Sequence, residues 1–274
     1  MKKFLTIGFV VAVLVACGDD DSDFATRPSG DSSFSSVTPQ SSDSETSVSS
    51  SSSAKSSSSL VKSSSSVAYV KPCRTDSVDI CEYGTLTDER DGQTYKTVTI
   101  GTQTWMAENL NFETADCHCY KDSAKYCAKY GRYYTWADAM DSAAFFSDNA
   151  KGCGDGKTCT VKTPARGICP EGWHIPDSTE WNTLYSAMGE SGYAMQAKGF
   201  EEWPNATDAY GFSAFPAGHY SDNFYNVGFS AFFWSASESN SGSAYHWYLF
   251  ASIASLSNDH GYKDDGIAVR CVKD

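Results

Sequence analysis

The chain has 274 residues, a formal net charge of −13 and a pI near 4.7. This length allows one or two domains. The excess of Asp and Glu excludes nucleic acid as the expected partner, because binding to phosphates by counterion release needs clustered Lys and Arg.

The first predicted element is a signal peptide over residues 1–16. Two lysines precede an apolar run that ends at Ala16 and is too short to cross a hydrocarbon layer of about 30 Å as a helix. Cys17 follows in the sequence Leu14-Val15-Ala16-Cys17, which resembles a bacterial lipobox. We therefore predict cleavage before Cys17 and acylation of this residue by fatty acids such as palmitate, which would anchor the chain to a membrane. The alternative is ordinary secretory cleavage with an incidental cysteine.

Residues 17–28 and 29–70 form the next two segments. The first contains the acidic run Gly18–Asp23, which resembles the export signals of surface lipoproteins; the start of a solvated linker is the alternative. In the second, 22 of the 38 residues from 29 to 66 are serine, a composition that cannot bury enough apolar surface to fold. We predict a disordered linker, and a lipid-anchored protein of the outer membrane that faces the cell exterior.

A folded domain is predicted over residues 71–274, where 33 of 204 residues are aromatic. Asp177 and Glu180 have the spacing of a capping box, in which two side chains satisfy free N–H groups at a helix start. Apolar residues then recur at helical spacing over Trp181–Met188. These features predict a helix that starts after Asp177 and ends before Gly189.

The other predicted elements are a shorter helix, short strands and loops. Runs rich in Thr, Val and aromatic residues between turn residues favour strands. The shorter helix covers Thr135–Met140, and the strands cover Tyr95–Ile100, Phe232–Trp234, Tyr245–Phe250 and Ile267–Val272. Residues 250–266, rich in Ser, Asn and Asp, are expected to form a long loop of the kind that often carries function. The predicted fold is α+β, loop-rich and disulfide-stapled, with two short helices and small antiparallel sheets.

Nine cysteines remain after Cys17, which in an exported chain predicts a disulfide framework with one odd thiol. Proximity favours three short loops, and the remaining pair joins the start of the main helix to the last strand. The predicted pairs are Cys73 with Cys81, Cys119 with Cys127, Cys153 with Cys159, and Cys169 with Cys271. Cys117 has no partner in this scheme. Three possibilities remain for it: pairing in place of Cys119, a disulfide to another molecule, or a free thiol. A zinc site of Cys117, His118, Cys119 and Cys127 is the competing interpretation, which an oxidising compartment disfavours.

No catalytic signature is found in the sequence. It lacks the Gly-x-Ser-x-Gly, His-Glu-x-x-His and Gly-x-Gly-x-x-Gly motifs. Gly156-Lys157-Thr158 resembles the end of a phosphate loop, but Lys151 stands where its first glycine is needed. Asp264-Asp265-Gly266 supplies only the tail of a calcium loop. We therefore predict that the protein is not an enzyme and holds no cofactor, and no lectin-type motif supports calcium.

Aromatic and amide side chains remain as candidate ligand contacts. Aromatic rings stack on the apolar faces of sugars, and Asn and Asp pair with sugar hydroxyls. The candidates are Trp203, Tyr210, Tyr220, Asp222, Asn223 and Tyr225, with His219 and Asn226 in the same stretch. The alternative is that most of these rings pack in the core.

Several motifs between about Cys81 and the C-terminus follow one another in an order typical of one family. They are Asp91–Leu110 (DGQTYKTVTIGTQTWMAENL), Gly131–Trp136 (GRYYTW), Cys169–Pro176 (CPEGWHIP) followed by Glu180–Trp181, Phe233–Ser235 (FWS) and Val269–Val272 (VRCV). These residues resemble the Fibrobacter succinogenes major paralogous domain. The resemblance implies an exported, often lipid-anchored surface module with a C-type-lectin-like fold, and it brings neither an activity nor catalytic residues.

Two further comparisons of motifs concern function. Trp173–Trp181 is similar to a stretch of formylglycine-generating enzymes, whose redox cysteines and copper chemistry have no clear counterpart here. The Glu-Pro-Asn, Gln-Pro-Asp and Trp-Asn-Asp triplets of calcium-dependent lectins are missing. We predict a cell-surface module that binds extracellular polysaccharide and helps the cell adhere to fibre. A structural or protein-binding envelope module, linked through Cys117, is the first alternative, and an enzyme of unknown reaction is the second.

Overall fold

The computed structural model describes residues 70–274. The predicted signal peptide, Cys17, the acidic run and residues 29–69 of the predicted linker lie outside the described residues. Val70, the last residue of that linker, donates its backbone N–H to the carbonyl of Ala187 at 3.2 Å and so belongs to the fold. Within the described part of the chain, no helix is both long and apolar enough to cross a membrane.

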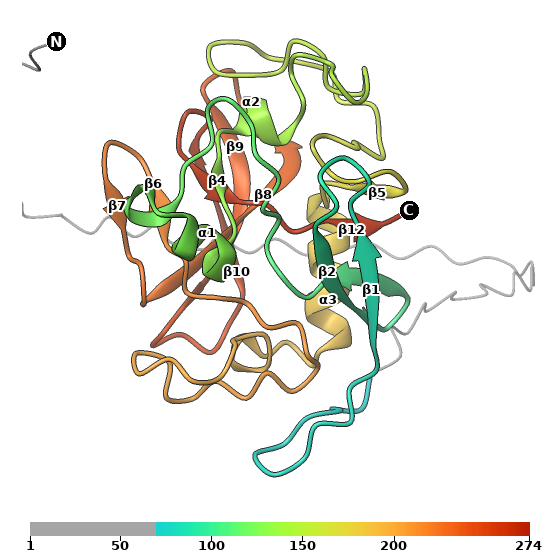
Figure 1. Ribbon diagram of the computed structural model, residues 1–274, viewed down its shortest axis with the longest axis vertical. Helices are drawn as coiled ribbons and strands as arrows, with labels where there is room; N and C mark the ends of the chain where they lie inside the picture. The colour runs from blue at the N-terminus through green and yellow to red at the C-terminus, as the bar shows by residue number, and fades with distance from the viewer. Residues whose placement is uncertain (1–69) are drawn as a thin grey trace, which may run out of the picture. The chain divides into compact units, whose positions relative to one another are not determined.

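A first antiparallel sheet has the strand order β1-β2-β3-β12-β5 (Figure 1). Its strands are β1 (Tyr83–Thr87), β2 (Thr94–Ile100), β3 (Gln103–Met106), β12 (Val272–Lys273) and β5 (Trp173–His174). In β2, which contains the predicted strand Tyr95–Ile100, buried and exposed residues nearly alternate because successive side chains point to opposite faces. The last strand lies between β3 and β5, so the C-terminus of the chain sits beside the start of the main helix.

A second sheet has the order β10-β9-β8-β11-β4. Its strands are β10 (Ser257–Tyr262), β9 (Ser243–Phe250), β8 (Ser230–Glu238), β11 (Ile267–Ala268) and β4 (Tyr133–Tyr134). All neighbours pair antiparallel except β11 with β8. The predicted strand Ile267–Val272 is in fact two strands, one in each sheet, because the chain crosses from β11 to β12 within a few residues. This crossing couples the two sheets covalently.

The expected long loop at residues 250–266 is wrong in part, because it contains β10. This strand pairs with β9 from Ser257 opposite Tyr248 to Tyr262 opposite Ser243. Its polar sequence indicated a loop, yet an edge strand needs only backbone pairing on one side and tolerates polar side chains. The pairing leaves shorter connections before and after the strand.

Helix α3 (Ser178–Ala187) begins and ends as predicted. The Asp177 side chain accepts the backbone N–H groups of Thr179 and Glu180, while Glu180 accepts the N–H of Asp177 at 2.9 Å. Trp181 and Leu184 are buried on its inner face. The shorter predicted helix is α2 (Trp136–Ala139), capped by the side chain of Thr135.

Three helical segments were not predicted from the sequence. They are η1 (Tyr120–Asp122), α1 (Ala124–Tyr130) and η2 (Gly192–Ala194). The seven residues of α1 carry no side-chain N-cap bond, and the helix is held by the disulfide Cys119–Cys127 and by packing of Tyr130. A short helix stabilised by tertiary contacts has no strong local sequence signal. With two five-stranded sheets, one two-stranded sheet, few short helices and four disulfides, the described chain is a mixed α+β domain.

All four disulfides join the cysteines that the sequence paired. They are Cys73–Cys81, Cys119–Cys127, Cys153–Cys159 and Cys169–Cys271. Cys117 is the free cysteine within residues 70–274. The zinc set weighed above is excluded as such, because two of its four ligands are consumed in the Cys119–Cys127 bond.

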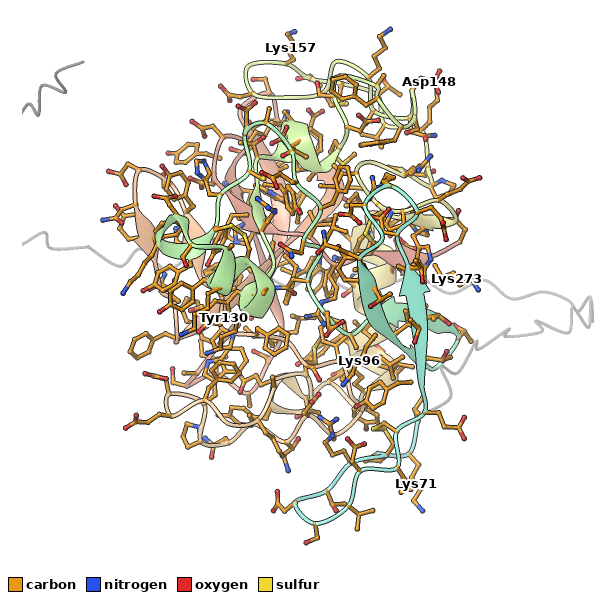
Figure 2. All side chains as sticks on the ribbon, in the orientation of Figure 1. Lys71, Lys96, Tyr130, Asp148, Lys157 and Lys273 are labelled. Carbon is orange, nitrogen blue, oxygen red and sulfur yellow. A yellow bond between two sulfur atoms is a disulfide. The ribbon has the colours of Figure 1, made fainter. Side chains whose placement is uncertain are left out.

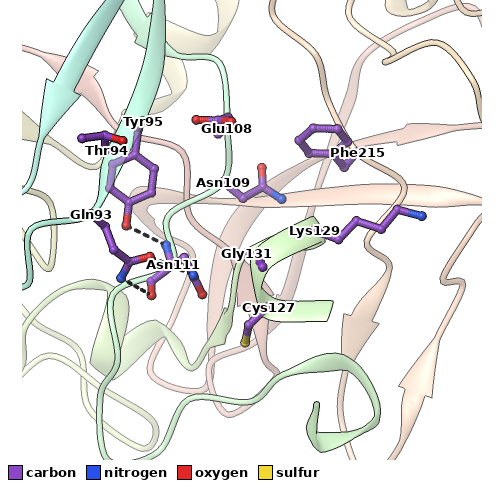
Figure 3. Close-up of a pocket in the computed structure, with 11 residues that line it drawn as sticks. Gln93, Thr94, Tyr95, Glu108, Asn109, Asn111, Cys127, Lys129, Gly131 and Phe215 are labelled. Atoms are coloured by element: carbon purple, nitrogen blue, oxygen red, sulfur yellow. Dashed lines mark hydrogen bonds between the residues drawn. The ribbon is translucent and has the colours of Figure 1, made fainter. Parts of the chain in front are cut away.

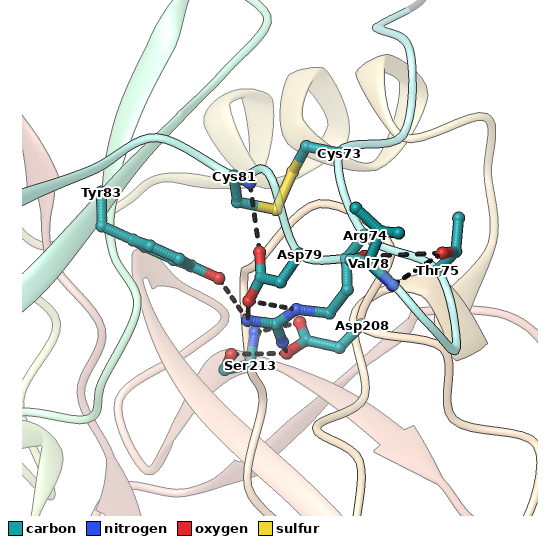
Figure 4. The surroundings of a disulfide bond; sticks show 9 residues. All are labelled: Cys73, Arg74, Thr75, Val78, Asp79, Cys81, Tyr83, Asp208 and Ser213. Atoms are coloured by element: carbon teal, nitrogen blue, oxygen red, sulfur yellow. Dashed lines mark hydrogen bonds and ion pairs between the residues drawn. A yellow bond between two sulfur atoms is a disulfide. The ribbon is translucent and has the colours of Figure 1, made fainter.

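An ion-pair cluster fixes the first disulfide loop to the rest of the domain (Figure 4). The Arg74 guanidinium donates to Asp79 at 2.5 Å and 2.9 Å and also binds Asp208 from the segment before Phe212. The buried Asp208 carboxylate accepts the Ser213 hydroxyl at 2.7 Å as well. The cluster therefore compensates a buried charge and holds residues 73–81 in place.

Aromatic side chains and one buried cation fill the interior, and Figure 2 shows how densely side chains occupy the space between the elements. Arg270 is fully buried and donates to the carbonyl oxygens of Phe212 and Ser213 and to the amide oxygen of Asn109. Its guanidinium carbon lies 4.5 Å from the centre of the Phe212 ring. Burial lowers the pKa of Arg270 to about 9, so hydrogen bonds from every side of the group are what stabilise the cation there.

Candidate ligand-binding surface

The six residues predicted as ligand contacts separate into two groups. Trp203 and Tyr210 are 2% and 3% exposed, which corrects their assignment to a binding surface. The Trp203 indole donates its N–H to the carbonyl of Phe229 at 2.9 Å, and both rings belong to the core under α3. Large aromatic residues bury most of their area in any fold, so ring type alone does not distinguish core from surface.

The other four residues lie together on the hairpin of β6 (His219–Tyr220) and β7 (Phe224–Tyr225), at the left of Figure 1. Asp222 and Asn223 are exposed at its turn. The Tyr225 hydroxyl donates to the Asp222 carboxylate at 2.5 Å, which raises the pKa of Tyr225 and lowers that of Asp222. Tyr220 stacks on His118 with ring centres 4.0 Å apart. The hairpin thus holds its polar and aromatic groups in a fixed arrangement.

A tight backbone junction attaches this hairpin to the second sheet. Gly218 donates its N–H to the carbonyl of Ser230 at 2.7 Å, and Tyr220 exchanges two backbone hydrogen bonds with Gly266 at 2.8 and 2.7 Å. Gly218 has φ +65°, and a Cβ there would lie 2.1 Å from the carbonyl oxygen of Tyr225. Only glycine fits this position without moving the hairpin.

Beside the hairpin, aromatic rings continue across the face of β8 and β9 that lies opposite the core under α3, where Phe232 belongs to the other core cluster and Tyr248 and Phe250 pack against it. We call this surface the ring array, defined as His219, Tyr225, Phe232, His246, Tyr248 and Phe250. Its centre is nearly closed to solvent, since Phe232 and His246 are 9% and 8% exposed. Tyr225 is 42% exposed, and the remaining rings are half-buried. The array therefore has a packed centre with partly open rings around it.

Strand register explains why these rings meet. Phe232 lies opposite Tyr248 in the β8–β9 pair, so both side chains point to the same face. Their ring centres are 5.8 Å apart, and Phe232 is 5.1 Å from the His219 ring of the hairpin. The alternate residues Phe233 and Trp247 point inward to the core under α3. Strand β8 is therefore buried on both faces over most of its length, and its ring contacts with the hairpin could not be predicted from its own sequence.

The two imidazoles of the array stay neutral at neutral pH. Burial lowers the pKa of His246 to about 4, and it also lowers the pKa of His219, against the opposing charge of Asp265. The Nδ1 atoms of both rings are buried without a hydrogen-bond partner among the described residues. Gly261 lets this region pack closely, because a Cβ there would lie 3.0 Å from the Nδ1 of His246 and 3.7 Å from Asp265.

A polar hollow of about 590 Å³ borders the array through Asp265 and Ser221. Its lining is rich in carboxylate, amide and hydroxyl groups: Asp155, Ser221, Asn240, Ser241, Tyr262, Asp264 and Asp265. Burial raises the pKa of Asp265, and a hydrogen bond to Ser221 opposes this shift. No group of three His, Cys, Asp or Glu in the described chain is arranged to hold a metal ion. The hollow offers donors and acceptors suited to hydroxyl groups.

A second, smaller polar cavity of about 160 Å³ lies between β2 and α1 (Figure 3). The Asn111 amide donates to the Gln93 side chain at 2.8 Å, and the Asn111 backbone N–H donates to the Tyr95 hydroxyl at 3.1 Å. The Gln93 side-chain amide also donates to the carbonyl of Asn111 at 3.1 Å, and Figure 3 shows how Gln93, Tyr95 and Asn111 are linked along the cavity wall. A space of this size holds a few waters, so we regard it as structural.

His174 also proves structural in position. Its ring lies between the carboxylates of Glu180 and Asp274, with both N···O distances 2.7 Å. Burial lowers the pKa of His174, but the two hydrogen bonds outweigh burial and the pKa is raised overall. The imidazole ties the capping box of α3 to the last residue of the chain.

Cys117 is half-buried and engaged within the domain. Its sulfur accepts the N–H of Thr114 and one N–H of Arg132, both at 3.3 Å. The thiol is thus held against its own chain. An interchain bond through this residue would first have to break these contacts.

Comparison with known protein families gives one match. Residues 98–273 match the family model of the Fibrobacter succinogenes major domain. The chain belongs to this family, as its motifs suggested. No curated protein matches the chain, and no solved structure matches it. The family description names a domain and no activity, so the site must be interpreted from its own chemistry.

Proposed function

We propose that this domain binds extracellular polysaccharide at the ring array and the polar hollow beside it. The observation that carries the proposal is the contact chain of rings from Tyr225 through His219 and Phe232 to Tyr248, with partly open rings at its edge. Sugar rings present C–H groups on their faces, and aromatic rings remove these groups from water with little loss of conformational freedom. No catalytic group is needed for this role.

The polar groups beside the array supply the second half of sugar recognition. Ser221 lies in the turn of the hairpin, and it forms a hydrogen bond with Asp265. Both residues line the hollow. A chain stacked on the array would direct hydroxyls toward them, where carboxylate and hydroxyl acceptors form charge-assisted hydrogen bonds. The neutral imidazoles of His219 and His246 add no charge that a neutral glycan would have to offset.

The setting of the domain supports the same role. We infer that Cys17 is acylated, that the serine-rich segment forms a tether, and that the domain is held on the outside of the outer membrane. We also infer a C-type-lectin-like fold, which the small sheets, the few helices and the disulfide from Cys169 near the start of α3 to Cys271 near the C-terminus support. A tethered domain gains from many weak contacts with an insoluble polymer, because each contact raises the effective concentration for the next.

Depletion of the purified full chain by insoluble cellulose and xylan, with and without calcium, tests this proposal. We expect Tyr225→Ala and Tyr248→Ala each to weaken binding about tenfold. An aromatic side chain that stacks on a planar nucleobase contributes about 1–3 kcal/mol, and we take the same range for a ring that stacks on a sugar. Phe229→Ala is the matched control, because Phe229 is 54% exposed and lies outside both the array and the hollow. Absence of binding to these polymers and to a broad glycan panel would refute the proposal, as would equal losses in all three variants.

A further inference from the structure

We propose that a second site, separate from the ring array, binds a small organic cation, meaning an ammonium group on an apolar body. The site is a cavity of about 670 Å³ beside α2, which we call the Phe145 pocket. Its main lining residues are Phe112, Asp116, Asp138, Phe145, Phe146 and Ile168. This volume lies within the range of about 300–1,000 Å³ typical of small-molecule sites. The proposal does not depend on polysaccharide binding.

A rigid loop holds an aromatic ring out in solvent at the edge of this pocket. Phe145 is 82% exposed, the most exposed large apolar side chain of the described residues. The buried carboxylate of Asp141 accepts the backbone N–H groups of Phe145, Phe146 and Ser147 at 2.8, 2.7 and 2.8 Å. Three hydrogen bonds to one buried carboxylate fix the backbone of this loop. The Phe145 ring is therefore held in the exposed position and cannot easily fold inward.

The inner wall of the pocket is apolar and is itself braced from behind. Phe112 and Phe146 pack edge to face with ring centres 5.7 Å apart. Arg90 lies 3.9 Å from the Phe112 ring and 4.6 Å from the Phe146 ring. Asp88 neutralises this guanidinium with contacts of 2.8 and 2.6 Å. The two rings are therefore held in place before any ligand arrives.

Two carboxylates in the pocket lack an ion-pair partner among the described residues. Asp116 and Asp138 form no ion pair with any Lys, Arg or His within residues 70–274, whereas the nearby Glu113 is bound by Arg132 at 2.9 Å. Asp138 is half-buried and receives only the Thr114 hydroxyl, at 3.3 Å. Burial and then the charge of Asp116 raise the pKa of Asp138, and these two effects outweigh the opposing hydrogen bond from Thr114 and the opposing charge interaction with His118. Like charges beside an apolar wall are unfavourable unless a cation joins them.

The apolar wall and the two carboxylates determine which ligand would fit the pocket. An ammonium group would satisfy Asp138 and Asp116, and an aromatic or aliphatic body would cover Phe112, Phe146 and the inner side of Phe145. A neutral molecule of the same shape would leave the carboxylates uncompensated. An anion would be repelled. Discrimination between an amine and its neutral isostere is therefore the signature of the site.

Isothermal titration calorimetry of the full chain with phenylbutylammonium and with the neutral phenylbutanol tests this inference. We expect saturable binding of the amine and at least tenfold weaker binding of the alcohol, since a charge-assisted pair contributes about 1.5–3 kcal/mol. Equal affinity for both probes, or no saturable binding of the amine, would overturn it.

Matched variants locate the site and separate binding from folding. Asp138→Asn and Phe145→Ala should each weaken amine binding about tenfold or more. Asp148→Asn and Phe229→Ala are the controls, since both residues are exposed and lie outside the pocket. Asp138→Asn should at the same time raise the melting temperature, because it removes a half-buried charge repelled by Asp116. Amine binding that is unchanged in Asp138→Asn would contradict the proposal.

Discussion

Two buried histidines respond to pH in opposite directions. The pKa of His174 is raised between its two carboxylates, so its contribution to stability is complete below the unfolded value of about 6.5 and is lost as pH rises through the folded pKa. The pKa of His246 is lowered to about 4 by burial. Its contribution is complete above the unfolded value and is lost as pH falls from about 6.5 toward 4.

The His246 shift gives a prediction for acid stability. Wild type should lose on the order of 3 kcal/mol more unfolding free energy between pH 7 and pH 4 than His246→Phe, which keeps a ring in the array and removes the titration. Urea denaturation at the two pH values measures this difference. His260→Phe, at an exposed position of β10, is the control and should behave as wild type. Equal acid sensitivity in all three proteins would contradict the burial of a neutral imidazole.

At the scale of elements, α3 shows local signals and tertiary contacts acting together. The capping box was readable from Asp177 and Glu180, because cap chemistry is local. The bond from Glu180 to His174, which lies on β5, was not readable, because the partner residue belongs to another element. The same carboxylate thus caps the helix and joins it to the first sheet.

Removal of the helix cap should destabilise the domain measurably. Asp177→Ala is expected to reduce the free energy of unfolding by about 1 kcal/mol, because two backbone N–H groups of α3 lose their acceptor. Chemical denaturation at neutral pH checks this value. Asp148→Ala, on an exposed loop near the top of Figure 2, should change stability by less than about 0.5 kcal/mol. Similar losses in both variants would show that the cap contributes nothing specific.

At the scale of the whole molecule, the last residues of the chain close the domain. β11 and β12 belong to different sheets, and Cys271 between them is joined to Cys169 near the start of the main helix. The two cysteines are 102 residues apart in the sequence. A crosslink over such a long loop restricts the unfolded chain more than a short one does.

Loss of the long disulfide should therefore exceed loss of a short one. The double variant Cys169→Ala/Cys271→Ala is expected to lose up to about 4.7 kcal/mol, and Cys153→Ala/Cys159→Ala, with a separation of 6 residues, about 2 kcal/mol. Thermal or urea unfolding of both variants gives the comparison. A larger loss for the short pair would contradict the loop-length explanation.

The sequence by itself determined the family, the disulfide pairs, the main helix and the strands β2, β8, β9, β11 and β12. Each of these depends on signals that lie close together or repeat along the chain: the motif order, the spacing of Cys73 and Cys81, and the cap at Asp177. Helix α1 and strand β10 were not predicted. The disulfide Cys119–Cys127 stabilises α1, and pairing with β9 stabilises β10, so neither element has a strong signal in its own residues.

Only the tertiary structure decided which aromatic residues face solvent. Trp203 and Tyr210 are core residues, while Tyr225 joins Phe232 and Tyr248 in the ring array. These rings are chemically alike, and what separates them is the register of β8 and β9 and the attachment of the β6–β7 hairpin. Burial depends on contacts between distant segments, so neither site could be assembled from residue type and spacing alone.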